Sequence, residues 1–418
     1  MGAGPAGLLL GLRLAKENID VTLVDMGHEL DTQPRATHYA SPAVQELRKA
    51  GVLEDVRARG FTPDGVCWRK IDRTYLAGIQ MGVVKGDPDA MVCLPLNQLG
   101  QVFVEHLKNY PSANILWSHE VIGIEQDEKA ARVTCKTPNG EVTLEGDYVV
   151  GCDGANSKVR RALFGDWEFP GKTWAEQIVA TNVQLPLSLS ESNCCRSTIR
   201  LRSGITLTPT SSSIGNIGTW PPVSPTTACG ESLTVNSAVS LVMRYISPTL
   251  QSQVLIHQLI ERQPMKFETM LPGNPKPGDY KLTNISPYKI HQRCAEKFRV
   301  GRFLLVADAA HLCNPFGGLG LTGGMVDAGN LADCLIGVAE GIADPSIFDK
   351  YDEIRRGMWH KIINPVSSDN ILRLHDQDPD KAMENDEFLI TLAKAEKNPE
   401  LMEQMIVVCS LLRDSLMN

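Results

Sequence analysis

Two glycine-rich segments combine residue types and spacings that suit the binding of a phosphate-containing molecule. The first is GAGPAG at residues 2–7, followed by leucines at helical spacing and by the apolar stretch Val21–Asp25, which ends in an acid. Such glycines let the backbone approach a pyrophosphate, whose oxygens bind the free amides of the following helix. The acid can accept hydrogen bonds from ribose hydroxyls. The segment predicts a dinucleotide-binding loop, with a chance glycine turn as the alternative.

The second segment follows Arg302–Asp308, an apolar run that predicts a buried strand ending in an acid. Glycines then recur through Asn314–Gly324, ahead of a predicted helix from about Gly323 to Glu340. A carboxylate at a strand end can bind a polyol chain, and successive backbone amides at a helix start stabilise negative charge. A reduced flavin needs both features. A glycine turn that only links strand to helix is the alternative.

A third segment completes a known pattern. Residues 151–160 read GCDGANSKVR, after the strand-like run Tyr148–Gly151. With GAGPAG and the segment from Gly301 to Asp308, this order resembles the three motifs of the group A flavin-dependent monooxygenases, the p-hydroxybenzoate hydroxylase-like family, and especially its fungal secondary-metabolism members. The resemblance covers residues 1–184 and 261–375 and leaves the middle uncovered.

The resemblance implies FAD as the cofactor, with NAD(P)H as a transient electron donor. It implies reduction of FAD, reaction with O2 and transfer of one oxygen atom to a small, aromatic (phenolic or polyketide-like) substrate. No second Rossmann loop is found for the nicotinamide, which fits a family in which the donor only visits. The cofactor-binding residues that the resemblance implies are Gly2, Gly4, Gly7, Asp25, Arg35, Gln98, Asp153, Asp308, Pro315, Gly320, Leu321 and Thr322.

Other candidate residues remain open. Arg160 either serves the cofactor with Asp153 or is a solvated helix residue. His291 and His311 are interpreted as structural histidines, so no catalytic acid, base or nucleophile is assigned.

Two function alternatives remain: a non-oxygenating flavin oxidoreductase of the same fold, and an inactive relative or a truncated or frameshifted gene product.

Composition narrows the class of protein. The chain has 418 residues, 43% hydrophobic and 22% charged, as expected for a globular fold. A formal net charge of −8 argues against a nucleic-acid partner. The 11 cysteines lack zinc spacing and indicate reduced thiols in a cytoplasmic protein without a metal. No transmembrane segment or signal peptide is indicated. A homodimer is left open.

The expected fold class is α/β: a discontinuous Rossmann-like FAD-binding domain of the p-hydroxybenzoate hydroxylase type, an inserted β-sheet substrate domain and a short helical C-terminus. Single helices are predicted over Ser41–Arg57 and Leu96–Leu107. The expected boundaries are 1–72, 96–184 and 286–375 for the FAD domain, 73–95 and 185–285 for the substrate domain, and 376–418 for the tail.

Two places depart from the expected pattern. Only Met1 precedes the GAGPAG loop, where a central strand is expected. Residues 185–258 are poor in charge and rich in Ser and Thr, without a clean strand periodicity. We interpret this segment as an altered reading frame or a mis-joined exon, and a Ser/Thr-rich insertion loop is the alternative.

Overall fold

The structure is a computed structural model of the whole chain. It describes residues 1–33, 37–70, 72, 74–84, 86–166, 169–184, 197–200, 205–210, 238–245, 261, 263–265, 267–268, 274–375 and 377–410.

A mostly parallel sheet in two parts, with one antiparallel edge strand, forms the centre of the nucleotide-binding half. Met1 and Gly2 lie between the parts and bond to both. The Met1 ammonium donates to Val150 O (2.7 Å), Cys152 N donates to Met1 O (2.7 Å), and Gly2 N donates to Val24 O (2.8 Å). The first two residues therefore occupy the place where the sequence predicts the end of a central strand. The strands are β1 (Val21–Val24) beside β6 (Ala113–Leu116), and β10 (Val149–Gly151) beside β17 (Phe303–Leu305) and β16 (Arg299–Val300).

Helices cover this sheet, and their ends follow local sequence signals. Pro5 stands at the start of the first helix, where its fixed φ is favourable. The helix predicted over Leu96–Leu107 has those bounds, whereas the single helix predicted over Ser41–Arg57 is wrong. Gly51 adopts φ +80° and ends one helix before the next begins. The helices are α1 (Pro5–Lys16), α2 (Ser41–Ala50), α3 (Leu53–Arg59), α4 (Leu96–Leu107), α5 (Lys158–Phe164), α8 (Leu319–Ala339) and α9 (Ile347–Met358).

The central helix α8 is buried on most sides because glycines let its neighbours approach. A Cβ at Gly324 would lie 2.6 Å from the Cβ of Ala307, and one at Gly323 would lie 2.8 Å from Ile363. The helix starts at Leu319, four residues before the predicted Gly323, because Gly320 is itself helical. Close packing of α8 against α1, α2 and α9 closes the larger hydrophobic core.

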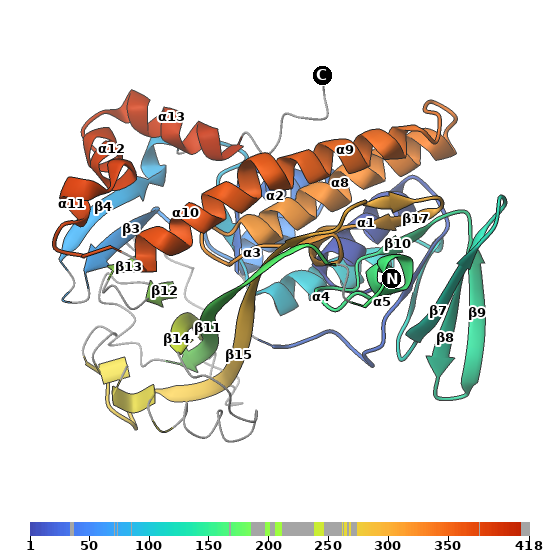
Figure 1. The fold of residues 1–418 in the computed structure, drawn as a ribbon, viewed down its shortest axis with the longest axis horizontal. Helices are drawn as coiled ribbons and strands as arrows, with labels where there is room; N and C mark the ends of the chain where they lie inside the picture. The colour runs from blue at the N-terminus through green and yellow to red at the C-terminus, as the bar shows by residue number, and fades with distance from the viewer. Residues whose placement is uncertain are drawn as a thin grey trace, which may run out of the picture.

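A second sheet, of eight described strands, extends from the first half and is antiparallel except where β12 meets β14. Its longest strands, β11 and β15, run from the nucleotide-binding half into the sheet (Figure 1). In spatial order the strands are β18 (His311–Leu312), β15 (Lys281–Cys294), β11 (Gly171–Gln184), β14 (Ala238–Tyr245), β12 (Ser197–Arg200), β13 (Ile205–Thr210), β3 (Gly65–Lys70) and β4 (Tyr75–Gln80). A small pair, β2 (His38–Tyr39) and β5 (Val92–Cys93), and a meander, β7 (Glu120–Gln126), β8 (Ala131–Thr137) and β9 (Gly140–Gly146), complete the strands.

The segment 185–258 lies mostly outside the described residues. Its described parts are the strands β12, β13 and β14, which hydrogen-bond into the second sheet. Residues 185–258 have no alternating strand pattern, so the sequence alone does not predict the place of these strands in the sheet. Whether the reading frame is altered stays a prediction, as do the domain boundaries given above.

The C-terminal helices cover the far end of the second sheet. Phe388 packs edge-on against Trp68 of β3, with ring centroids 5.3 Å apart, and Lys70 pairs with Asp380 at 2.6 Å. Among the described residues, none of the helices is long and apolar enough to cross a membrane. The helices follow a π-helical turn at Trp359–Ile363 and are α10 (Asn364–His375), α11 (Ala382–Asn385), α12 (Glu387–Ala395) and α13 (Pro399–Ser410).

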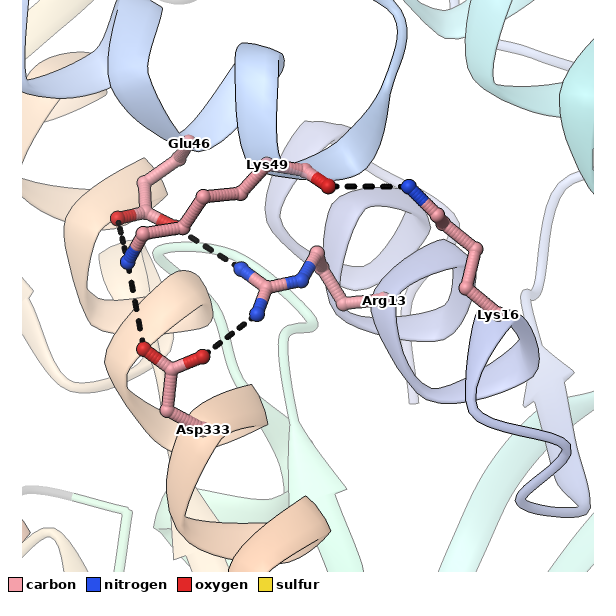
Figure 2. Close-up of polar contacts among 5 residues, drawn as sticks. All are labelled: Arg13, Lys16, Glu46, Lys49 and Asp333. Atoms are coloured by element: carbon pink, nitrogen blue, oxygen red, sulfur yellow. Dashed lines mark hydrogen bonds and ion pairs between the residues drawn. The ribbon is translucent and has the colours of Figure 1, made fainter.

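A cluster of charges fastens three helices of the first half together (Figure 2). Glu46 of α2 is only 4% exposed and accepts from Lys49 (3.0 Å) and from Arg13 of α1 (3.3 Å). Asp333 of α8 binds the same two cations, at 3.3 Å and 2.5 Å. The Glu46 carboxylate also fills the space beside Gly329, where a Cβ would lie 1.9 Å from Oε2. Burial raises the pKa of Glu46 in spite of both cations.

This pKa shift predicts how stability depends on pH. An acid whose pKa is raised on folding stabilises the fold below its unfolded pKa, and this contribution is lost as pH rises through the folded pKa. Glu46→Gln removes the ionisation. The stability of this variant relative to the parent should therefore improve as pH rises above about 4.5, the ordinary pKa of the acid, measured by urea unfolding.

Glu105→Gln is the matched control. Glu105 is an exposed acid whose pKa is lowered by its hydrogen bond with Arg59, so the stability of its variant relative to the parent should fall as pH rises towards about 4.5 and stay level above that pH. An equal or opposite trend for Glu46→Gln would contradict the burial argument.

Candidate functional site

Three backbone turns meet at the carboxyl edge of the parallel strands. The GAGPAG turn contacts the turn after β10, since a Cβ on Gly2 would lie 2.4 Å from the carbonyl oxygen of Cys152. The turn after β10 contacts the segment after β17, where Val306 N donates to Gly151 O (3.0 Å). The three sequence motifs, far apart in the chain, therefore share one edge, where ligands bind in open α/β sheets.

The first turn is tight because glycine is required at two of its positions. Gly2 has φ +93°, and a Cβ on Gly7 would lie 2.0 Å from the Gly2 carbonyl oxygen. Asp25, at the end of β1, holds the turn: its Oδ2 accepts from Ala3 N and its Oδ1 from Gly27 N, both at 2.7 Å. By contrast, a Cβ on Gly4 would meet nothing within 4 Å. Gly4 faces open space at the N-terminus of α1.

The second turn is held by a capped helix. Asp153 accepts from Ser157 Oγ (2.6 Å) and from Lys158 N (2.7 Å), at the start of α5. Arg160 is 4% exposed and donates to Ala309 O (3.0 Å), and its guanidinium lies 3.7 Å above the Phe169 ring. Burial lowers the pKa of Arg160 to about 10, against the opposing effect of Asp153. The interpretation of Arg160 as a solvated residue is therefore wrong; it joins the second turn to the third.

The third turn projects an acid and a pair of glycines. β17 ends at Leu305, so Asp308 lies in a short 3-10 turn (Ala307–Ala309) and not at the strand end as predicted. Asp308 is exposed, and Ala307 before it has φ +55°, a conformation that favours glycine. Farther on, Gly317 (φ +102°) and Gly318 (φ +66°) lead into α8. The first amides of α8 have no acceptor within the helix and are available to a ligand.

A buried ionic group behind the third turn was missed by the sequence analysis. Asp327 of α8 is fully buried and accepts from Arg355 Nε (2.6 Å) and from Ala307 N (3.3 Å), and its Oδ2 lies 2.7 Å from Nε2 of His311. Burial alone would raise the pKa of Asp327, but the Arg355 and His311 contacts outweigh it and lower the pKa. The acid within the otherwise uncharged stretch Gly323–Gly329 of α8 was the available signal.

The structure places the remaining predicted residues as follows. Thr322, in the first turn of α8, is 1% exposed. The residues Gln98, Pro315, Gly320 and Leu321 are half-buried, Gln98 near the start of α4 and the others around the start of α8. Arg35 lies outside the described residues.

The histidines agree with a structural interpretation. His311 is 1% exposed and paired with Asp327, and Nδ1 of His291 lies 2.9 Å from Thr173 Oγ1. In the part of the chain that the structure describes, no group of three or more His, Cys, Asp or Glu side chains is arranged to hold a metal ion.

The geometry fits a dinucleotide that carries a ring system. Each of the three turns contains one glycine beside open space, since a Cβ on Gly4, Gly154 or Gly318 would meet nothing within 4 Å. Side chains at these places would fill the shared edge. The donors around it are backbone amides at the N-termini of α1 and α8, which suit a pyrophosphate and a ring that gains negative charge. The residues present therefore fit FAD.

Comparisons with known proteins extend this picture. The family described as FAD binding domain matches residues 1–241 and 272–365. The match continues beyond residue 184 and so includes part of the segment that the motif resemblance leaves uncovered. The chain is 31% identical over 391 residues to para-nitrophenol 4-monooxygenase of Pseudomonas sp. (strain WBC-3), covering 92% of this chain and 89% of the relative. It is also 31% identical to 6-hydroxy-3-succinoylpyridine 3-monooxygenase HspB of Pseudomonas putida (strain DSM 28022 / S16), over 91% of this chain and 89% of that one.

Solved structures share the fold. Para-nitrophenol 4-monooxygenase PnpA from Pseudomonas putida DLL-E4 superposes with a TM-score of 0.81 at 29% identity, covering 99% of this chain and 96% of that chain. Aklavinone-11 hydroxylase, solved with FAD and aklavinone, superposes with a TM-score of 0.71 at 20% identity, covering 91% and 69% of the two chains, which supports the fold alone. The predicted α/β fold with an inserted sheet and a helical C-terminus is confirmed.

The open space at Gly4 gives a direct test of the shared edge. Gly4 has an extended backbone that alanine adopts freely, so Gly4→Ala should leave the stability of the FAD-free protein nearly unchanged. The added methyl group stands where the pyrophosphate would approach, so FAD affinity should fall by about tenfold or more. Fluorescence titration of FAD into the apoprotein measures this.

Gly357→Ala is the matched control, because it also adds a methyl group in open space but belongs to α9 and to none of the three turns. It should leave FAD affinity unchanged. Equal affinity for the Gly4→Ala variant and the parent would place the pyrophosphate elsewhere.

Proposed function

The chain belongs to the FAD binding domain family and is an FAD-dependent monooxygenase, and from this premise we propose that it hydroxylates a small phenolic ring with NAD(P)H as electron donor. The observation that carries the proposal is the similarity to para-nitrophenol 4-monooxygenase over 92% of this chain. That similarity spans both the nucleotide-binding half and the second sheet. A phenolic ring is therefore favoured over a polyketide-like substrate.

The protein's own part is to bind and orient the cofactor. In this proposal Gly2, Gly4 and Gly7 allow the pyrophosphate to reach the amides at the start of α1, and Asp25 orients the ribose while bracing the turn. Asp308, exposed in the third turn, binds the ribityl chain. Arg35 and Gln98 also contact the cofactor.

The remaining predicted residues surround the ring system. Pro315, Gly320, Leu321 and Thr322 lie against the isoalloxazine, where the first amides of α8 stabilise its negative charge without a charged side chain. Asp153 shapes the second turn, which the nicotinamide donor also approaches. Bound FAD supplies the electron transfer and the reaction with O2.

The second sheet supplies the substrate side in this proposal. β11 pairs with β15, and β15 pairs in turn with β18, which ends just before Cys313. These pairings join the second sheet to the third turn. A phenol reacts more readily as phenolate, so a base or a positive side chain beside the ring is required. The proposal also includes a cytoplasmic location, based on the reduced cysteines, and a fungal source in secondary metabolism. It leaves a homodimer open.

Oxygen labelling tests the reaction. The purified protein, loaded with FAD, is incubated with NADH or NADPH, a panel of phenols that includes 4-nitrophenol, and 18O2. We expect substrate-stimulated oxidation of one nicotinamide donor and a product that gains a single 18O atom, detected by mass spectrometry. The Gly4→Ala variant should lose product in proportion to its lost FAD.

Two outcomes would contradict the proposal. Donor oxidation that yields only hydrogen peroxide with every phenol would favour a non-oxygenating flavin oxidoreductase. A protein that takes up no FAD would favour an inactive relative.

A further inference from the structure

A single buried amide links the second sheet to the turn in front of α8. Gln292, near the end of β15, is 2% exposed. Its Oε1 accepts from the backbone N of Asn314 (3.0 Å) and from the side-chain Nδ2 of the same residue (3.2 Å). Its Nε2 donates to Ser367 Oγ (2.8 Å) and to Asn364 O (3.3 Å) in α10. The oxygen of the amide thus binds the turn in front of α8, and its nitrogen binds α10.

The segment held by this amide is the turn Asn314–Phe316. Asn314 is fully buried, and its Oδ1 accepts from Phe316 N (3.1 Å), which closes a local turn. Phe316 is also fully buried and packs in a second, smaller hydrophobic core, which lies between the eight-stranded sheet and the C-terminal helices. Asn370 of α10 donates to Phe316 O (3.3 Å). The turn is therefore fixed by β15, by α10 and by its own aromatic side chain.

The two residues between this turn and α8 also have a restricted backbone. Gly317 and Gly318 both have positive φ, and a Cβ on Gly317 would lie 2.8 Å from Nδ2 of Asn370. α8 begins at the next residue, Leu319. A shift of the turn is transmitted directly to the first amides of α8, since only two residues lie between them.

We propose that Gln292 is a positioning residue that sets the Asn314–Phe316 turn, and through it the start of α8, against the flavin ring. The inference rests on the proposed function, in which the start of α8 faces the isoalloxazine. No other side chain described above binds β15, the turn and α10 at once. Loss of the amide leaves the buried backbone and side-chain donors of Asn314 without their acceptor, which favours movement of the turn.

Three variants test the role of Gln292. Gln292→Met keeps the volume and removes all four hydrogen bonds. Gln292→Glu keeps an acceptor for Asn314, and when protonated it also keeps a donor for α10. Gln126→Met is the control: Gln126 of β7 also joins its strand to a distant segment, donating to Val300 O (3.2 Å) and accepting from Arg302 N (2.8 Å), but it is exposed and lies outside the turn.

The measurements are the dissociation constant for FAD, the visible absorption spectrum of the bound flavin, and the unfolding midpoint of the FAD-free protein. For Gln292→Met we expect FAD to bind at least about tenfold more weakly and the flavin bands to shift. Gln126→Met should match the parent in affinity and spectrum. A purely structural role would lower the unfolding midpoint of both variants without moving the flavin bands.

The glutamate variant separates positioning from folding. Burial keeps its carboxyl neutral at low pH, so Gln292→Glu should resemble the parent at about pH 6 and the methionine variant at about pH 9, while the parent changes little. An unchanged spectrum and an affinity within twofold of the parent for Gln292→Met would overturn the proposal, as would a glutamate variant that is equally weak at both pH values. The titration of the parent is read first: if the parent binds no FAD, the proposed function fails, which is distinct from a failure of Gln292.

Discussion

Close backbone contact between three turns is the constraint on which the rest of the structure depends. The carbonyl of Cys152 and the carbonyl of Gly2 occupy the places that side chains on Gly2 and Gly7 would need. Only glycine permits this approach, and it brings the N-terminus of α1 to the same edge as the turn after β10. The packing of the nucleotide-binding half therefore depends on glycines, because their lack of a side chain lets the backbones of these turns touch.

A buried charge keeps the third turn in place. Asp327 accepts from Ala307 N, and Ala307 holds a left-handed conformation that costs about 1–2 kcal/mol for a residue with a Cβ. The close contact with Gly324 and the hydrogen bond to Asp327 offset that cost. Because Arg355 and His311 both bind the Asp327 carboxylate, removal of Asp327 would leave the buried Arg355 guanidinium without its counter-ion, at a cost of about 3–5 kcal/mol. The buried Asp327 thus helps to hold Ala307, and with it the neighbouring Asp308, in the conformation that leaves Asp308 exposed.

Much of this arrangement could be predicted from the sequence, because glycine spacing and strand ends are local signals. The GAGPAG turn, the acid at Asp25 and the bounds of α4 follow from residues within a few positions of one another. The division of the helix at Gly51 was missed, since a left-handed glycine resembles any glycine in a helical pattern.

The buried polar residues could not be predicted, because their partners are distant in sequence. Gln292 reaches Asn314 and Ser367, and Arg160 reaches Ala309, 149 positions away. Nothing near these residues in the chain distinguishes them from exposed polar ones. The strands within 185–258 also escaped prediction, since the charge-poor segment lacks an alternating pattern.

The central claim is that the edge shared by the three turns holds FAD, with the pyrophosphate at α1 and the ring at α8. A crystal structure of the protein with bound FAD tests it most directly. We expect pyrophosphate density against the backbone between Gly2 and Gly4 and ring density in front of Gly318–Thr322. Flavin density at any other face of the molecule, or a ring turned away from the start of α8, would contradict it.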